Sequence, residues 1–234
     1  MKNKTKYLVA ILLMLVSFLL IGATNVNAET TTAEVNNYSD LTDKMNDNVT
    51  NVVKLTSDIT LREDFDTTFS LEMSKTLDFN GFTLTIPQQY KLKLIYYNTL
   101  DLKFINSSSS KTAKLKILTH STHPIYNEIM NSEYTVNFEI DGVDVEYERD
   151  FEINWAYAGR KNFNNLVFKN LKVTGFYAVT WASGKTIKFS NVTKESKNVP
   201  YKTYLINSST LTVDDIIDAD SVIEYYPSGG TKVT

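Results

Sequence analysis

After its first 50 residues, most of the chain alternates apolar and other residues with a period of two, which is typical of β-strands with one buried face. Five segments share one form, in which two apolar residues flank a variable one and an Asn or Asp follows within two positions. They are Leu77–Asn80, Leu102–Asn106, Phe138–Asp141, Leu166–Asn170 and Ile187–Asn191. Their polar markers are separated by 21 to 35 residues, which is near the length of one coil of a solenoid.

The recurring marker predicts an all-β fold, a right-handed parallel β-helix, in which each coil buries its apolar face only by stacking on its neighbours. Asn tolerates the left-handed backbone that a tight corner needs, and its amide can bond to an equivalent residue in the next coil. We therefore expect a structural corner ladder made of Asn80, Asn106, Asp141, Asn170 and Asn191.

A β-sandwich is the alternative, because it also contains many short strands with turn residues between them. Its hairpins would favour Asn-Gly and Asp-Gly turns, and the chain has only two such pairs, Asn80-Gly81 and Asp141-Gly142. The marker also recurs at one place relative to its strand, so the pattern favours the β-helix.

One short amphipathic helix is predicted just before the first clear strand. Ser39 is the expected N-cap, Asp40 lies in the favoured first turn, and Leu41 and Met45 are spaced to share one face. The helix should end near residues 46–48. We expect it to cap the exposed end of the strand stack, which would otherwise invite aggregation.

The N-terminus has the pattern of a cleavable signal peptide. Basic residues precede an apolar run over 7–21, and Val26 and Ala28 suit a peptidase that cuts before Glu29. An uncleaved membrane anchor is the alternative, but a run of about 15 residues is shorter than the roughly 20 that span a bilayer. We expect residues 1–28 to be a signal peptide, 29–35 a flexible leader and 36–234 a single β-helix domain, with truncation at its C-terminus left open.

The composition indicates the cellular compartment of the protein and argues against some classes of partner. The chain has no cysteine, so an exported form is held by its core alone, which favours a Gram-positive bacterium as the source. A net charge of −3 with no basic cluster argues against nucleic acid as a partner. No later apolar segment is long enough to cross a membrane, so no integral span is expected after signal cleavage.

Three segments carry a family resemblance: Tyr38-Ser39-Asp40-Leu41, residues 52–61 with Leu55-Thr-Ser-Asp58-Ile59-Thr60, and residues 75–84 with Asp78-Phe79-Asn80-Gly81-Phe82-Thr83-Leu84. Together they resemble the opening of the pectate-lyase-like adhesive domains of Gram-positive surface proteins. The resemblance covers about residues 35–215. It implies a β-helix used for attachment at the cell surface, with a cell-wall or host glycan or protein as partner, and does not imply lyase chemistry. The chain departs from the family in having no Leu-Pro-x-Thr-Gly sorting sequence.

The best candidates for a metal site are the clustered carboxylates Asp141, Asp144 and Glu146, which could hold calcium as the lyases of this fold do. They alternate with Val143 and Val145, however, and a strand with one solvated face produces the same pattern. We therefore expect no catalytic residues and no cofactor, with calcium left open.

An aromatic cluster is the best candidate for ligand binding. Trp155, Tyr157, Arg160, Tyr177 and Trp181 could stack on sugar rings and bond their hydroxyls. The alternative is that the same aromatic residues fill the core. The sequence thus predicts a secreted or cell-surface, adhesin-like interaction domain that is not an enzyme. A diverged polysaccharide lyase or hydrolase and a structural fragment of a larger surface protein are the alternatives.

Overall fold

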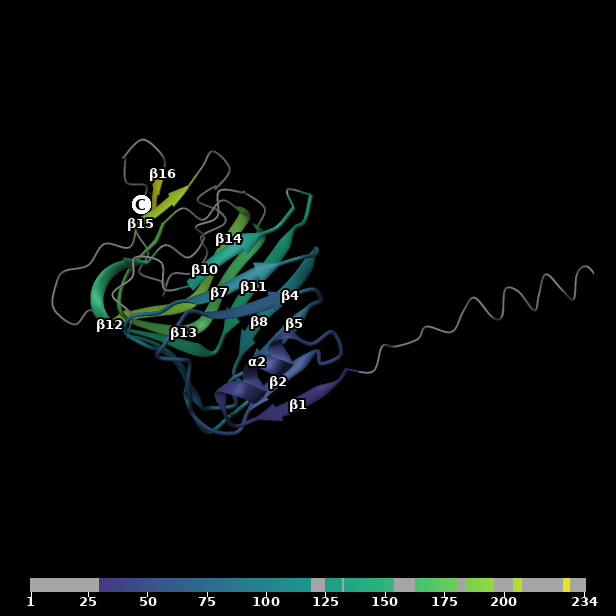
Figure 1. Cartoon of the computed structure of the whole chain (residues 1–234). Coiled ribbons are helices and arrows are strands. Elements are labelled where there is room, and N and C mark those ends of the chain that lie inside the picture. Colours follow the sequence, from purple (N-terminus) through teal and green to yellow (C-terminus); the bar gives the residue numbers. More distant parts are fainter. Residues whose placement is uncertain are drawn as a thin grey trace, which may run out of the picture. The chain divides into compact units, whose positions relative to one another are not determined.

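The computed structural model describes residues 30–118, 125–131, 133–153, 163–180, 184–195, 204–207 and 225–227. It is mostly β, with one short helix (Figure 1). Every strand pair in these ranges is parallel, so the β-sandwich alternative, which needs facing antiparallel sheets, is wrong.

The strands pair in three rows, which we call the first, second and third ladders. The first ladder contains β1 (Thr32–Val35), β2 (Val52–Leu55), β5 (Lys75–Asp78), β8 (Leu100–Ile105) and β11 (Val136–Asp141). The second contains β3 (Ile59–Thr60), β6 (Thr83–Ile86), β9 (Ala113–Ile117) and β12 (Val143–Ile153). The third contains β4 (Thr67–Leu71), β7 (Leu92–Tyr96) and β10 (Ile125–Ile129).

The long strand β13 (Phe163–Thr180) joins the first two ladders, because its first part pairs with β11 and its later part with β12. Strand β14 (Gly184–Glu195) pairs along β13. Strand β15 (Tyr204–Asn207) pairs with the last residues of β13, and β16 (Tyr225–Pro227) pairs with β15. From β2 to β10 the chain visits the first, second and third ladders in turn, three times over. This arrangement is consistent with a β-helix or solenoid.

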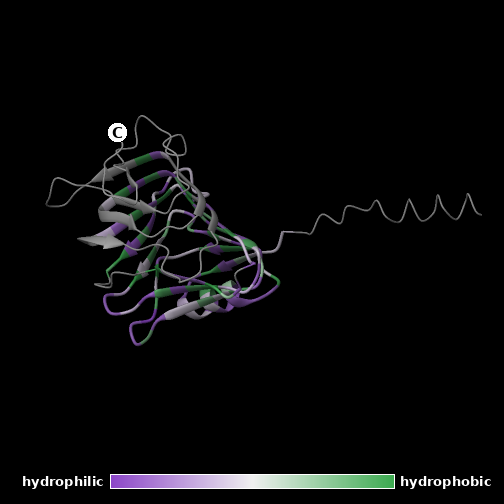
Figure 2. Ribbon diagram, turned by 90° about the horizontal axis from the view of Figure 1, so that it is seen from above, coloured by the Kyte–Doolittle hydropathy of each residue, from purple (hydrophilic) through white to green (hydrophobic). Residues whose placement is uncertain are grey.

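The core follows from the period-two pattern, because alternate side chains of each strand point inward and meet those of the neighbouring strands. Figure 2 shows this alternation of hydrophobic and hydrophilic residues along the strands. Phe104 of β8 lies fully buried between Phe79 and Phe138, with ring centroids 5.7 Å and 5.2 Å away. The apolar side chains of successive strands therefore stack on one another, as the sequence pattern predicts.

The corner ladder is confirmed in part. Asn80, Asn170 and Asn191 have the expected left-handed backbone, and Asn191 donates its amide to Asn170, which donates to Asp141. Asn106 and Asp141 do not have positive φ, which corrects that part of the prediction. The left-handed place beside Asp141 is taken by Gly142, whose N–H bonds to the carbonyl of Lys169. Asn106 instead opens a longer loop and donates to the carbonyl of Lys111.

The two corner glycines offer a matched test of backbone strain. Gly81 (φ 78°) and Gly142 (φ 71°) both lie in the left-handed region, where a Cβ costs about 1–2 kcal/mol. At Gly142 an added Cβ meets only Asn106 at 3.5 Å, whereas at Gly81 it collides with the side chain of Lys111. We expect Gly142→Ala to lower the free energy of unfolding by about 1–2 kcal/mol, and Gly81→Ala by more, in urea titrations. Equal losses of unfolding free energy in the two variants would contradict a collision between the new Cβ at position 81 and Lys111.

The predicted helix is present as α2 (Tyr38–Asn46), and Leu41 and Met45 are fully buried, as expected. Its N-cap is Asn37 and not Ser39: the Asn37 side chain accepts the N–H of Asp40 at 3.0 Å. Ser39 lies inside the first turn instead. Both residue types are good caps, so the sequence alone could not decide between neighbouring positions.

Helix α2 packs against β4, the outermost strand of the third ladder among the described residues. Asn46 accepts the N–H of Ser70 at 2.7 Å and donates to the carbonyl of Thr68 at 3.5 Å. The helix thereby bonds part of a strand edge that would otherwise be open, which supports the capping role.

Residues 32–35 correct the flexible-leader prediction. They form β1, which pairs in register with β2 from Thr32–Val52 to Val35–Leu55, and Val35 is buried. The pattern of Thr32-Ala33-Glu34-Val35 is too short and too polar to show a strand by periodicity. The pairing of β1 with β2 at the end of the first ladder depends on the tertiary structure, so it could not be predicted from these four residues.

The loop after α2 predicts an acid-sensitive contribution to stability. Burial alone would raise the pKa of Asp47, but hydrogen bonds from Thr50, Lys75 and the N–H of Val49 outweigh it and hold the pKa well below its ordinary 3.8. A lowered folded pKa stabilises the protein above the unfolded pKa, and that stabilisation is lost as the pH falls below about 4. We expect Asp47→Asn to be less stable than wild type at pH 7, with the difference shrinking below pH 4 in denaturant titrations. A pH-independent difference would contradict this.

Candidate ligand-binding site

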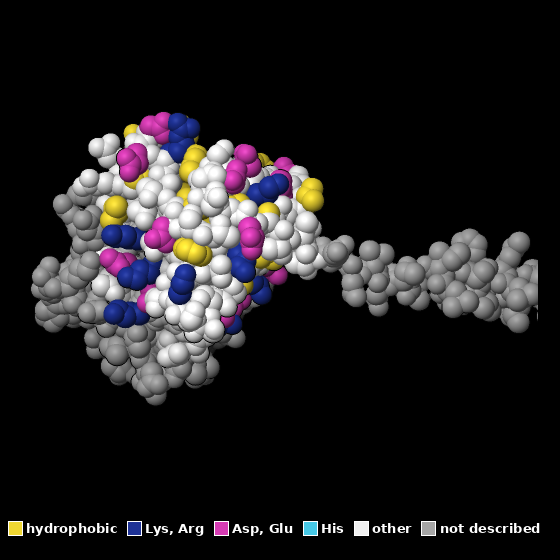
Figure 3. All heavy atoms as spheres, turned by 90° about the horizontal axis from the view of Figure 1, so that it is seen from below, with side chains coloured by type: hydrophobic (Ala, Val, Ile, Leu, Met, Phe, Trp, Pro, Cys, Tyr) yellow, Lys and Arg dark blue, Asp and Glu magenta, His cyan; other side chains and the backbone are white. Residues whose placement is uncertain are grey.

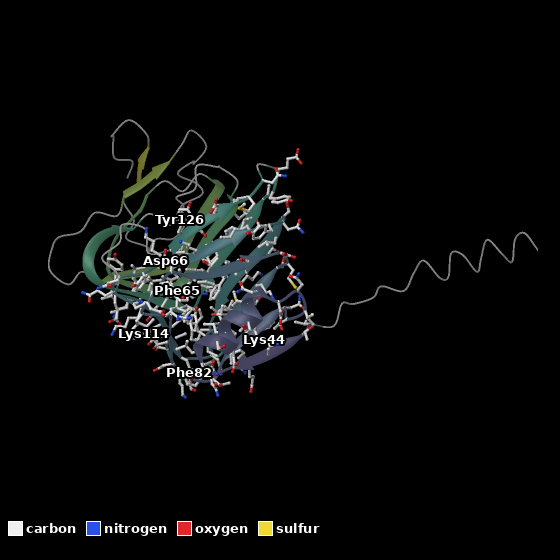
Figure 4. All side chains as sticks on the ribbon, viewed as in Figure 1. Lys44, Phe65, Asp66, Phe82, Lys114 and Tyr126 are labelled. Carbon is white, nitrogen blue, oxygen red and sulfur yellow. The ribbon has the colours of Figure 1, made fainter. Side chains whose placement is uncertain are left out.

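The outer face of the third ladder carries the candidate site. Phe69, Leu94 and Asn127 are buried, so the residues on either side of them point outward. The strand register places the outward residues in two rows, Thr68–Lys93–Tyr126 and Ser70–Ile95–Glu128. These outward side chains are of mixed polarity, and Figure 4 labels Tyr126 from this ladder and Phe65 and Asp66 just before β4.

Exposed hydrophobic residues gather at the ends of this ladder. Of the four large hydrophobic side chains that are exposed in the described ranges, Phe65 (46%) precedes β4, Tyr97 (41%) follows β7 and Met130 (42%) follows β10. The fourth, Val49, lies in the loop before β2. Tyr97 and Met130 follow the paired residues Tyr96 and Ile129 at one end of the ladder, and Phe65 lies at the other end, so exposed apolar side chains flank the face on both sides.

A pocket of about 330 Å³ opens where the second ladder passes into the third. It is lined by Glu63 from the loop between β3 and β4, by Pro87, Gln88, Gln89 and Tyr90 from the loop between β6 and β7, and by Leu118 after β9. Pro87 is buried, whereas Gln88 and Gln89 are exposed. The pocket thus combines an apolar base with two amides, a carboxylate and a phenol, a composition that suits a small polar ligand.

Arg62 fixes the loop on one side of the pocket. Its guanidinium binds the carboxylate of Asp64 through two nitrogens, one of them Nε at 2.6 Å, and lies 3.8 Å from the ring centroid of Phe65. It also lies 5.9 Å from the ring of Tyr38 on α2. Hydrogen bonds from Arg62 lower the pKa of Asp64. The exposed Phe65 ring is therefore held in place by a stacked cation.

Asp66 joins the starts of β4 and β7. Its carboxylate accepts the backbone N–H of Lys91 at 2.9 Å and pairs with the Lys93 ammonium at 2.9 Å. Partial burial would raise the pKa of Asp66, but the bonds from Lys93 and Lys91 outweigh it and lower the pKa. Because Asp66 stays ionised, the two loops that carry Glu63 and Tyr90 are tied together.

The aromatic cluster expected from the sequence is not tested. Trp155, Tyr157, Arg160 and Trp181 lie outside the described residues, and Tyr177 lies within β13 without a described side chain. Its role in ligand binding stays a prediction.

The acidic residues proposed as calcium ligands have protein partners. Asp141 pairs with Lys169 at 3.2 Å, Glu146 pairs with Lys114 at 3.2 Å, and Asp144 accepts the N–H of Lys172 at 2.8 Å. In the ranges that the structure describes, no three metal-binding side chains are grouped to hold an ion. The calcium alternative gains no support from this strand.

The pocket residues were not predicted as a site. The one available sequence indication was Pro87-Gln88-Gln89-Tyr90, a polar turn with an aromatic residue directly after an alternating segment. Loops that join regular strands often carry function, but which loops meet at one corner depends on the strand pairing.

Comparison of the chain with protein-family models, with curated proteins and with solved structures found no match. None of the described helical residues makes a helix with the length and apolar character needed to cross a bilayer.

Proposed function

We propose that this chain is a secreted, right-handed parallel β-helix domain that binds carbohydrate without catalysis. The binding surface is the outer face of the third ladder together with the pocket that Glu63 and Tyr90 line. The chain's sequence resemblance to the pectate-lyase-like adhesive domains supports a role in attachment at a Gram-positive cell surface. The observation that carries the proposal is the coincidence, on one ladder, of the pocket and three of the four exposed large hydrophobic residues.

The chemistry of this face suits a sugar chain. The exposed ring of Phe65 and the half-buried ring of Tyr90 offer apolar faces to sugar rings, while the Tyr90 hydroxyl and the amide of Gln89 can bond sugar hydroxyls. At about 3.3 Å per residue, the five residues of β7 span roughly 16 Å. This length accommodates several sugar units in an extended conformation.

Binding to a panel of polysaccharides, measured by affinity electrophoresis and calorimetry, tests the proposal. We expect Tyr90→Ala to weaken binding by about tenfold or more, because an aromatic side chain at a pocket is the typical centre of binding energy. Val49→Ala is the control, since Val49 is exposed to 67% but does not line the pocket. Equal effects of the two substitutions would contradict the site, and cleavage of a polysaccharide would support the lyase or hydrolase alternative.

A further inference from the structure

We infer that the carbohydrate bound on the third ladder is an amine-bearing sugar chain, such as a hexosamine oligomer with free amino groups, and that uronate polymers are excluded. The inference rests on the proposed function and names its substrate class. It follows from the charges on the described part of this face.

The third ladder and its loops carry more negative than positive side chains. Up to the end of β10 the outward cations are Arg62, Lys91 and Lys93, and the anions are Glu63, Asp64, Asp66, Glu72 and Glu128. Glu133, in the loop after β10, is a further exposed carboxylate. Two of the cations are neutralised locally, because Arg62 pairs with Asp64 and Lys93 with Asp66. Up to the end of β10, this leaves one cation, Lys91, and three carboxylates, Glu63, Glu72 and Glu128, outside these two pairs.

These three carboxylates lie at different places along the face. Glu63 lines the pocket, Glu128 shares a row with Ile95, and Glu72 follows β4 beside Tyr97. No ion pair of Glu63, Glu72 or Glu128 occurs among the described residues, although Glu72 accepts the amide of Asn48 at 2.8 Å. A polymer with a charge on each unit would meet them in succession.

Protonated amines match this arrangement in two ways. An ammonium group donates short, charge-assisted hydrogen bonds to carboxylates, and it is also attracted to the faces of aromatic rings. Glu63 and Tyr90 line the same pocket, so both kinds of contact are available there. A uronate chain would instead place its carboxylates against carboxylates, which costs binding energy.

The face seen from below in Figure 3 shows Lys and Arg side chains interspersed with Asp and Glu. Among the described residues Lys114, for example, pairs with Glu146. A mixed surface of this kind has no strong positive field to attract an acidic polymer.

Calorimetry of the full chain with three probes of equal length tests the inference: a glucosamine oligomer, its N-acetylated counterpart and an oligogalacturonate, at mildly acidic pH. We expect the glucosamine oligomer to bind about tenfold more tightly than the acetylated one at low ionic strength, with the preference shrinking as salt screens the charges. The oligogalacturonate should bind most weakly. Glu63→Gln should reduce the amine preference without weakening the acetylated probe, whereas Glu34→Gln, on the exposed side of β1, should change neither.

The outcomes separate the two proposals. Equal binding of all three probes, or tightest binding of the oligogalacturonate, would overturn the substrate class and leave carbohydrate binding standing. No binding of any of the three probes would also overturn the substrate class, and the proposed function itself falls if no polysaccharide of the panel described above binds either. An amine preference that Glu63→Gln leaves unchanged would overturn the role of the pocket carboxylate.

Discussion

Replacing Lys75 by Met is expected to lower the free energy of unfolding by about 3–5 kcal/mol, the range found when one partner of a buried charged pair is removed. Lys75 is only 2% exposed. Its ammonium donates to four oxygens: the carbonyls of Lys44, Asp47 and Thr50 at 3.0, 2.6 and 2.6 Å, and the Asp47 carboxylate at 3.0 Å.

The cost arises because three carbonyl oxygens lose a charged donor at a buried position, although the Asp47 carboxylate keeps its bonds from Val49 and Thr50. The last carbonyls of a helix have no partner within it, and the end of α2 carries the negative end of the helix dipole. Methionine keeps the length and apolar stem of lysine but has no donor. The substitution therefore leaves several buried oxygens without a hydrogen bond while preserving the packing.

Chemical denaturation measures the effect, and Lys103→Met is the matched control. The Lys103 side chain is 48% exposed and pairs with Glu139 at 3.7 Å, so its loss should cost less than about 1 kcal/mol. A loss below 1 kcal/mol for Lys75→Met as well would show that water replaces the ammonium at this helix end.

Lys75 also shows what the sequence does and does not reveal. It has the same parity as Leu77 and Phe79, which are buried, so the alternation of β5 places it inside. What the sequence cannot show is the oxygen cage that makes burial of a lysine tolerable, since that cage comes from a helix end about 30 residues earlier.

The period-two pattern predicted the first two ladders well because their inward positions are almost all aliphatic or aromatic. It did not predict β4, β7 and β10. Thr67 and Asn127 interrupt the apolar inward positions of β4 and β10, whereas the inward residues of β7, Leu92, Leu94 and Tyr96, do follow the pattern. Tyr96 donates its hydroxyl to Asn127 at 2.8 Å, so a polar pair is satisfied inside the core. A short strand with polar inward residues resembles a loop in sequence, and the candidate site lies on this ladder.

The corner ladder was predictable where one residue must turn the chain. Asn170 and Asn191 lie inside β13 and β14, where the strand turns without a loop, and both have positive φ. Asn106 is instead followed by a loop that reaches to residue 112. A longer connection turns without a left-handed residue at that point. At Asp141 the neighbouring Gly142 adopts the strained conformation at lower cost.

Phe104→Ala is expected to cost about 3–5 kcal/mol of unfolding free energy, because it removes a fully buried ring from the middle of the core. Phe65→Ala removes the same side chain from an exposed position and should cost less than about 1 kcal/mol. Urea titration of both variants measures the difference. Comparable losses would mean that the core at β8 refills the space or that its packing is loose.

Double-mutant cycles around Phe104 test the stacking on which the proposed β-helix depends. The Phe79–Phe104 and Phe104–Phe138 rings are in contact, so each pair should show a coupling of about 0.5–1.5 kcal/mol. Phe79 and Phe138 belong to segments two strand spacings apart, roughly 10 Å, and should not couple measurably. In a stack of coils each layer touches only its neighbours, so coupling energies should follow this order. A strong Phe79–Phe138 coupling would require these rings to meet directly, which contradicts coils stacked in the order β5, β8 and β11.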